Sequence, residues 1–228
     1  FGATGPYKNR GGFDLVAQGM SGIMSVTGHP GSPPVKAGVP ITDLNAGMLA
    51  AYGILTAYIN RLRTGEGQMV DTSLLEAGIA YTFWESAEYF ATGNIPAPKG
   101  SGHRLNAPYQ AFYTSDGYIN IGAANQANWE RLCKSIGRQD LLDNPDYRTN
   151  SARMNNLEEL VGILQDTFAS NSVEHWIDIL QSAGVPCGPI YNMDQVYNDP
   201  HVKARDMLVE VIHPKAGPVK NIGIPIKL

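Results

Sequence analysis

The amino-acid sequence predicts an α/β protein in two domains. Three features support this prediction: a stretch with helical periodicity at residues 44–62, a hairpin pattern at residues 110–122, and a segment rich in glycine and proline at residues 93–108. Helical and strand patterns on either side of such a segment are typical of two compact parts joined by a linker.

The composition supports a folded chain with a sizeable core. Its 228 residues suffice for one large domain or two small ones. Apolar residues make up 43% and charged residues 17%, which argues against disorder. The formal net charge of −4 argues against general nucleic-acid binding, which needs clustered Lys and Arg. A local basic patch for a phosphorylated cofactor stays compatible with that charge.

The first residues, FGATGPYKNRGGFD, are typical of an internal loop and lack a starting Met, so we expect an N-terminal segment to be missing. A short helix is predicted at residues 13–20, with Asp14 as its N-cap. Residues 28–40 then form a loop rich in glycine and proline that cannot continue this helix.

The clearest helix follows this loop. Asp43 stands just before it, at the predicted N-cap. Its apolar residues recur at steps of three and four: Leu44, Met48, Ala51, Tyr52, Leu55, Ile59 and Leu62. Arg61 and Arg63 suit the negative end of a helix, and Gly65 follows as a predicted terminator.

Capping and turn signals predict the remaining elements. Ser73 and Glu76 have the spacing of a capping box, which opens a helix predicted at residues 74–91. The turn residues Ser115, Asp116 and Gly117 lie between two short segments and predict a β-hairpin. Further helices are predicted at residues 127–136, 151–168, 173–183 and 193–198, and strands at residues 208–212 and 222–226.

The sequence predicts no disulfide framework, metal site or membrane span. Cys133 and Cys187 lie far apart and form no CxxC pair, which favours a reducing compartment, the cytoplasm or the mitochondrial matrix. No two histidines have the i, i+4 spacing of a helical metal site. His29 and His103 lie in glycine-rich loops, where a solvated role is favoured over a place in a cleft. No apolar run reaches the roughly 18 residues that span a bilayer.

Asp43 is the main candidate for chemistry. From the residue type alone, a role as a helix cap is the stronger interpretation. A helix N-terminus also stabilises negative charge, so the carboxylate would be ionised and able to attack an activated carbonyl. The backbone N–H groups there could hold the resulting oxyanion. No GxSxG elbow, P-loop or dinucleotide fingerprint offers a competing site.

Several segments resemble the class III (CaiB/BaiF-type) CoA-transferases, and the similarity extends over essentially the whole chain. These segments are GGFDLVAQGMSGIMSVTG, GVPITDLNAGMLAAYGILTAYINRLRTGEGQMVDTSLLEA and AGVPCGPIYNMDQV. A further segment, APYQAFYTSDGYINIGAANQANWERLC, is most similar to the succinyl-CoA:glutarate (dicarboxylate) group.

This resemblance implies a fold and a division into domains. The large domain has a Rossmann-like portion whose N-terminal part is missing here, a smaller α+β domain follows, and two chains interlock as a homodimer. Residues 1–96 would be the remainder of the large domain. Residues 97–200 would form the small domain with its linkers, and residues 201–228 would return to the large domain.

The resemblance also implies a mechanism in which CoA, as acyl-CoA, is a substrate and no metal takes part. Asp43 matches the aspartate that attacks the acyl-CoA thioester, giving a mixed anhydride and then an aspartyl-CoA thioester. Phe13 matches an aromatic residue that contacts CoA. Arg10 is a weaker CoA-binding candidate, because the basic position of the family holds Gly11 here. Residues 100–102 could act as a lid, although the consecutive glycines of oxalate-specific relatives are absent.

Two alternatives stay open. An α-methylacyl-CoA racemase shares the fold but needs two groups that exchange protons. The racemase histidine aligns with Phe13 and its partner glutamate aligns near Asn125, and neither replacement can take a proton. The other alternative is a non-catalytic CoA-binding or assembly subunit in which Asp43 is only a cap.

Overall fold

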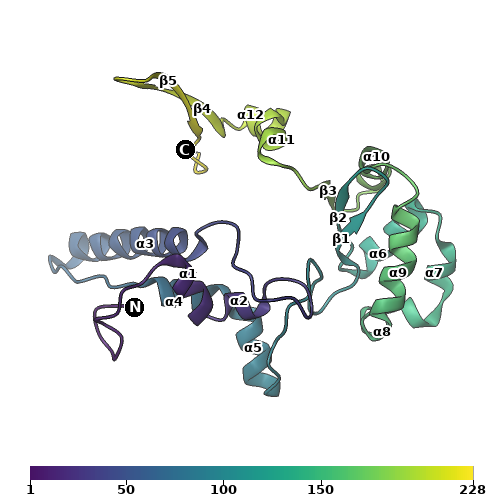
Figure 1. Ribbon diagram of the computed structural model, residues 1–228, viewed down its shortest axis with the longest axis horizontal. Coiled ribbons are helices and arrows are strands. Elements are labelled where there is room, and N and C mark those ends of the chain that lie inside the picture. The colour runs from purple at the N-terminus through teal and green to yellow at the C-terminus, as the bar shows by residue number, and fades with distance from the viewer. Residues whose placement is uncertain (228) are drawn as a thin grey trace. The chain divides into compact units, whose positions relative to one another are not determined.

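The computed structural model describes residues 1–227. It contains both helices and β-strands, as the sequence predicts (Figure 1). The chain divides into two compact units, one of residues 1–104 and one that begins at Leu105. The division predicted above, at residues 1–96, 97–200 and 201–228, stays a prediction.

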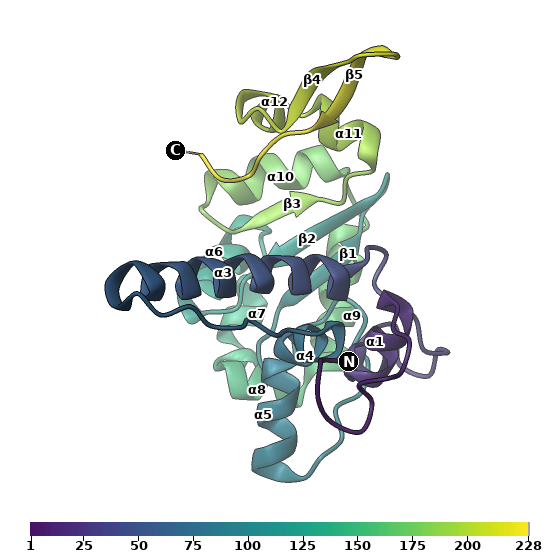
Figure 2. The same ribbon diagram turned by 90° about the vertical axis from the view of Figure 1, so that its left-hand side faces the viewer.

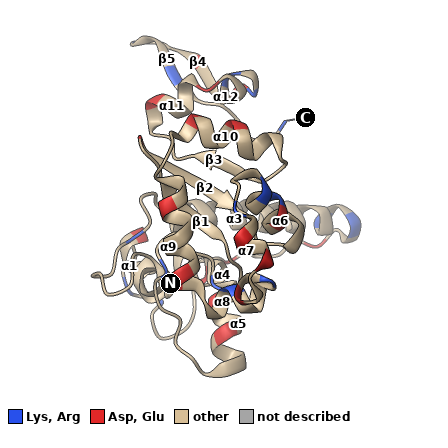
Figure 3. Cartoon of the chain, turned by 90° about the vertical axis from the view of Figure 1, so that its right-hand side faces the viewer, with Lys and Arg blue, Asp and Glu red and all other residues tan. Residues whose placement is uncertain are grey.

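The first unit is helical. Its elements are α1 (Asp14–Met20), α2 (Ile23–Val26), α3 (Ile41–Thr64), α4 (Leu74–Tyr81) and α5 (Phe83–Thr92). Helices α1, α2 and α3 pack against α4, and α1 also contacts α3 (Figure 2). The predicted long helix α3 is confirmed, and Gly65 ends it in the left-handed conformation at φ 80°. Figure 3 shows basic residues at that end, where the last turn holds Arg61 and Arg63.

Three predicted boundaries in this unit are wrong. The N-cap of α1 is Phe13 rather than Asp14, and that of α3 is Pro40 rather than Asp43, which is the third residue of the helix. The helix predicted at residues 74–91 is two helices, because Thr82 closes a tight turn. Its N–H and its hydroxyl both donate to the carbonyl oxygen of Ile79, at 3.0 and 2.9 Å.

The apolar stripe that predicts α3 is not its buried side. Within the described residues, the buried positions of this helix are Thr42, Ala46 and Ala57. The large apolar side chains are exposed: Leu44, Met48, Tyr52, Leu55, Ile59 and Leu62. The small inner residues let α3 approach α4, since helices pack closely where side chains are short.

The second unit contains an antiparallel sheet of three strands, β1 (Tyr109–Tyr113), β2 (Tyr118–Gly122) and β3 (Cys187–Pro189), in the order β1-β2-β3. The predicted hairpin is confirmed: Tyr113 pairs with Tyr118 across the turn. Asp116 joins this turn to a helix, because its Oδ1 accepts from the N–H of Val173 at 2.8 Å.

Helices cover this sheet and form the main core with it (Figure 2). They are α6 (Gln126–Ser135), α7 (Gln139–Asp143), the 3-10 turn η1 (Pro145–Tyr147), α8 (Asn150–Asn155), α9 (Leu157–Phe168) and α10 (Val173–Ser182). The core residues include Phe112, Ile119, Trp129 and Leu164. The helix predicted at residues 151–168 is two helices, which meet at Asn156 (φ −113°, ψ 31°).

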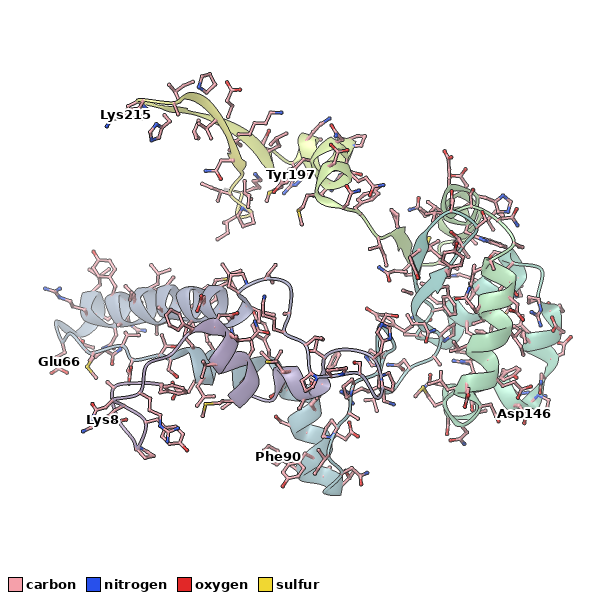
Figure 4. All side chains as sticks on the ribbon, in the orientation of Figure 1. Lys8, Glu66, Phe90, Asp146, Tyr197 and Lys215 are labelled. Carbon is pink, nitrogen blue, oxygen red and sulfur yellow. The ribbon has the colours of Figure 1, made fainter. Side chains whose placement is uncertain are left out.

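The C-terminal elements are α11 (Met193–Asn198), α12 (Pro200–Ala204), β4 (Leu208–His213) and β5 (Gly217–Ile222). The strand predicted at residues 222–226 lies earlier, because β4 and β5 form a tight hairpin in which His213 pairs with Gly217. His213 Nδ1 accepts from the N–H groups of Lys215 and Ala216 at 3.2 and 3.1 Å, which stabilises the turn. Lys215 is labelled in Figure 4.

The described residues contain neither a candidate membrane span nor a candidate metal site. None of their helices combines the length and the apolar character needed to cross a membrane. Likewise, no group of three or more His, Cys, Asp and Glu in residues 1–227 is arranged to hold a metal ion.

Candidate active site

Asp43 lies in the first turn of α3 and its side chain is exposed. Within residues 1–227 its carboxylate makes no hydrogen bond or ion pair. The positive end of the helix dipole favours a negative charge at this position. The carboxylate is therefore open to a reactant in this unit.

The backbone donors around Asp43 are mostly occupied. The N–H of Ile41 donates to Val39 O at 2.8 Å, and that of Leu44 to Pro40 O at 3.0 Å. Thr42 N–H donates to the Asp14 carboxylate at 3.0 Å. Among these N–H groups in the described part of the chain, only that of Asp43 has no acceptor. The oxyanion donors expected from this turn therefore reduce to a single N–H group.

Asp14 lies in α1, as predicted, but it caps α3 and not α1. Its Oδ1 accepts from the N–H of Thr42 and, at 2.8 Å, from the Thr42 hydroxyl. Burial raises the pKa of the Asp14 carboxyl, but hydrogen bonds from Thr42 and Gln18 outweigh it and hold that pKa below its usual value. Asp14 is thus an ionised cap for the start of α3, supplied by a different helix.

Gln18 completes this arrangement and was not singled out from the sequence. It is fully buried. Its Nε2 donates to Asp14 Oδ2 at 2.7 Å, and its Oε1 accepts from the N–H of Ala37 at 2.8 Å. The available signal was its position four residues after Asp14, on the same face of the helix.

Phe13 directly precedes Asp14, whereas Arg10 contacts Tyr7. Phe13 is the N-cap of α1 and is 80% exposed. It directly precedes Asp14, which bonds to the residue before Asp43, so the fold brings both predicted positions to one region. The Arg10 guanidinium lies 3.7 Å from the centre of the Tyr7 ring, a cation–π contact that occupies it.

The two glycine-rich loops of this unit contact each other. The N–H of Gly100 donates to Gly28 O at 2.8 Å. A Cβ added at Gly100 would lie 3.0 Å from His29 Nδ1, so the close approach needs glycine. The His103 ring packs edge-on against Trp84, at 5.3 Å between centres. His29 and His103 therefore have packing contacts, and the lid role of residues 100–102 stays a prediction.

Asn125, the position aligned near the second racemase base, belongs to the second unit. It is the N-cap of α6, and its Oδ1 accepts from the N–H of Asn128 at 2.8 Å. This is a structural role that an amide performs well. It offers no group that could take a proton from a substrate.

Comparisons with known proteins agree with the sequence resemblance. The model of CoA-transferase family III matches residues 1–228. A succinyl-CoA:glutarate CoA-transferase of Homo sapiens is 36% identical over 227 residues, which is 100% of this chain and 52% of the relative. A succinate–glutarate CoA-transferase of Agrobacterium fabrum is 32% identical and matches 99% of this chain and 56% of the relative. The chain thus spans about half the length of these curated relatives.

A solved structure extends the similarity to the fold. The crystal structure of a CaiB/BaiF family protein from Brucella suis has a TM-score of 0.82 and 35% sequence identity. The match covers 100% of this chain and 59% of that protein. It confirms the predicted fold class. The interlocked dimer stays a prediction.

Proposed function

Because the chain belongs to CoA-transferase family III, we propose that the full-length protein transfers CoA from an acyl-CoA thioester to a carboxylic acid. The observation that supports this proposal is the exposed carboxylate of Asp43 in the first turn of α3. The names of the human and Agrobacterium relatives suggest the substrates, succinyl-CoA as donor and a dicarboxylate such as glutarate as acceptor.

The proposed reaction begins when an oxygen of Asp43 attacks the thioester carbonyl and expels CoA thiolate. This leaves an aspartyl–acyl mixed anhydride. The thiolate attacks the aspartyl carbonyl, which releases the donor acid and gives an aspartyl-CoA thioester. The acceptor carboxylate then attacks the carbonyl of that thioester and expels CoA thiolate, which leaves a second mixed anhydride. The thiolate attacks the acceptor's carbonyl in this anhydride, which gives the new acyl-CoA and frees Asp43. Each step exchanges one activated acyl bond for another, so ATP is not required.

The proposal also assigns roles in CoA binding and in water exclusion to residues other than Asp43. Phe13 is proposed to contact CoA, and its exposed ring is available for this. Arg10 is the weaker candidate, because its guanidinium lies over Tyr7. Residues 100–102 are proposed to help exclude water, which would hydrolyse the anhydride. The two free cysteines are compatible with a reducing compartment, and a bacterial cytoplasm or a mitochondrial matrix is the proposed location.

The two alternatives are less well supported. Racemisation needs a proton acceptor on each side of the α-carbon. Phe13 has none, and the amide of Asn125 caps α6. A non-catalytic subunit would need Asp43 to act only as a cap. Asp43 is not the N-cap of α3, and its side chain caps no N–H in the described residues.

The proposal is tested with full-length protein, succinyl-CoA and glutarate, by measuring glutaryl-CoA with mass spectrometry. We expect Asp43→Asn and Asp43→Ala to lower the rate roughly 1000-fold or more, because the covalent route is lost. Glu66→Gln is the matched control: it removes an exposed carboxylate just beyond α3 (Figure 4) and should leave the rate unchanged.

The same reactions in D₂O separate transferase from racemase. Transfer at carboxyl groups leaves the α-hydrogens of recovered acyl-CoA unexchanged, whereas a racemase would introduce deuterium there.

The Asp43 variants test the covalent route itself. If CoA transfer survives both Asp43→Asn and Asp43→Ala, the covalent proposal is excluded.

A further inference from the structure

Helix α3 has no side-chain cap of its own. The first N–H groups of any helix lack partners within it and need an acceptor. The N-cap of α3 is Pro40, which has no side-chain oxygen. The carboxylate of Asp14 supplies the missing acceptor from α1, which lies beside the start of α3 (Figure 2).

Asp14, Gln18 and Thr42 form what we call the α1–α3 clamp. Asp14 Oδ1 accepts two hydrogen bonds from Thr42, at 3.0 Å from N–H and 2.8 Å from the hydroxyl, and Oδ2 accepts one from Gln18 at 2.7 Å. Gln18 and Thr42 are both 0% exposed. Gln18 also accepts from the N–H of Ala37 and so fixes the loop that leads into α3.

The clamp is braced on its other side by α4. Asn45 Nδ2 donates to Ala77 O at 2.8 Å. A Cβ added at Gly78 would lie 3.1 Å from Cγ2 of Thr42, so the side chain of Thr42 is confined there. Thr42 directly precedes Asp43, and the backbone that carries the Asp43 carboxylate is therefore fixed from two directions.

We propose that Asp14 is a positioning residue for Asp43. Its charge and its hydrogen bonds to Thr42 hold the first turn of α3, so that the Asp43 carboxylate is presented at the angle that attack on a thioester requires. This inference rests on the proposed function. A displacement of about 1 Å at a reacting group can cost about 100-fold in rate. The clamp therefore acts on the rate of acylation rather than on substrate binding.

The test measures acylation of Asp43 in full-length protein. Protein and succinyl-CoA are mixed and quenched with hydroxylamine over a time course, and the peptide that contains Asp43 is quantified by mass spectrometry. The wild type gives an amplitude and a rate constant. For Asp14→Ala we expect the rate constant to fall roughly 100-fold, with an unchanged amplitude and a Kd for free CoA within about twofold. A merely structural role would lower the amplitude instead, because part of the protein would be unfolded.

Further variants keep the test decisive if Asp14→Ala folds poorly. Thr42→Val keeps the shape and removes one hydrogen bond, so we expect about a fivefold slower acylation. The double variant Asp14→Asn with Gln18→Glu tests the hydrogen bond between these two side chains. Asp14→Asn alone directs an amide N–H₂ at the N–H₂ of Gln18 and should slow acylation. Adding Gln18→Glu restores a donor–acceptor pair, so the rate constant of acylation should be at least tenfold higher than that of Asp14→Asn. Asp71→Asn, in the same unit, is the matched control and should stay within twofold.

Two negative results are distinguishable. If the wild type forms the Asp43 adduct and the folded Asp14 and Thr42 variants form it at the same rate constant, the positioning role is wrong and the proposed function stands. A loss of amplitude alone would also contradict the positioning role. If the wild type forms no adduct on Asp43, the proposed function fails and this inference fails with it.

Discussion

Arg153 is a fully buried charge in the core of the second unit. Its Nε donates to Ala107 O at 2.7 Å and its Nη1 to Tyr147 O at 3.0 Å. The guanidinium also lies 4.9 Å from the Trp129 ring centre. In residues 1–227, Nη2 has no hydrogen-bond partner. Burial lowers the pKa of this guanidinium, yet arginine starts so high that it stays charged.

Replacing Arg153 by Ala should destabilise the protein by roughly 3 kcal/mol. The carbonyl groups of Ala107 and Tyr147 would lose their donor, and each such loss costs about 1–3 kcal/mol in a buried site. Urea unfolding followed by circular dichroism measures this difference. Arg148→Ala, an exposed neighbour, should change stability by less than about 0.5 kcal/mol. Equal stability of the two variants would contradict a structural role for Arg153.

Gly78 is required where α4 meets α1. A Cβ at this position would lie 2.6 Å from Ser21 Oγ and 2.7 Å from Ser21 Cβ. We expect Gly78→Ala to lower the free energy of unfolding by roughly 1–3 kcal/mol through overpacking. Gly162→Ala in α9 is the control: a Cβ there meets no atom within 4 Å, so alanine should stabilise that helix by up to about 1 kcal/mol. A Gly78→Ala variant that is more stable than the wild type would contradict overpacking against Ser21.

At the scale of the element, the cap of α3 makes that helix sensitive to acid. The pKa of Asp14 is lowered in the folded protein. Its stabilising contribution is therefore complete above the unfolded pKa of about 3.9 and is lost as the pH falls through the lower folded value. Asp140, whose pKa is lowered by the Arg138 guanidinium, adds a similar effect in the second unit.

We expect the stability difference between wild type and Asp14→Asn to be largest near pH 7 and to shrink steadily from about pH 5 toward pH 2. Urea unfolding at several pH values measures it, and comparison with the variant removes the contribution of Asp140. A difference that stays constant over this range would mean that the charge of Asp14 does not hold α3.

The elements show what the sequence could and could not predict. The hairpin at Ser115–Gly117 and the helix after Asp43 follow from local turn and periodicity signals, and both are present. The cap of α3 depends on Asp14, which is 28 residues away from Thr42. Such a bond needs the relative placement of two helices, and no local propensity contains it. The break at Thr82 depends on its hydroxyl, which donates to the carbonyl oxygen of Ile79 three residues earlier and competes only weakly with a continuous helix.

At the scale of the whole molecule, the apolar side of α3 is the main feature left without a partner in the described residues. Its large side chains, from Leu44 to Leu62, are exposed. The chain spans about half the length of the curated relatives it matches. The predicted homodimer and the return of residues 201–228 to the large domain stay predictions.

The proposed reaction depends on acylation of Asp43 during turnover. The most direct measurement is digestion of full-length protein after incubation with succinyl-CoA and hydroxylamine, followed by mass spectrometry of every acidic peptide. We expect a hydroxamate on Asp43 that forms only when the thioester is present. An unmodified Asp43 in protein that still produces glutaryl-CoA from succinyl-CoA and glutarate would contradict it.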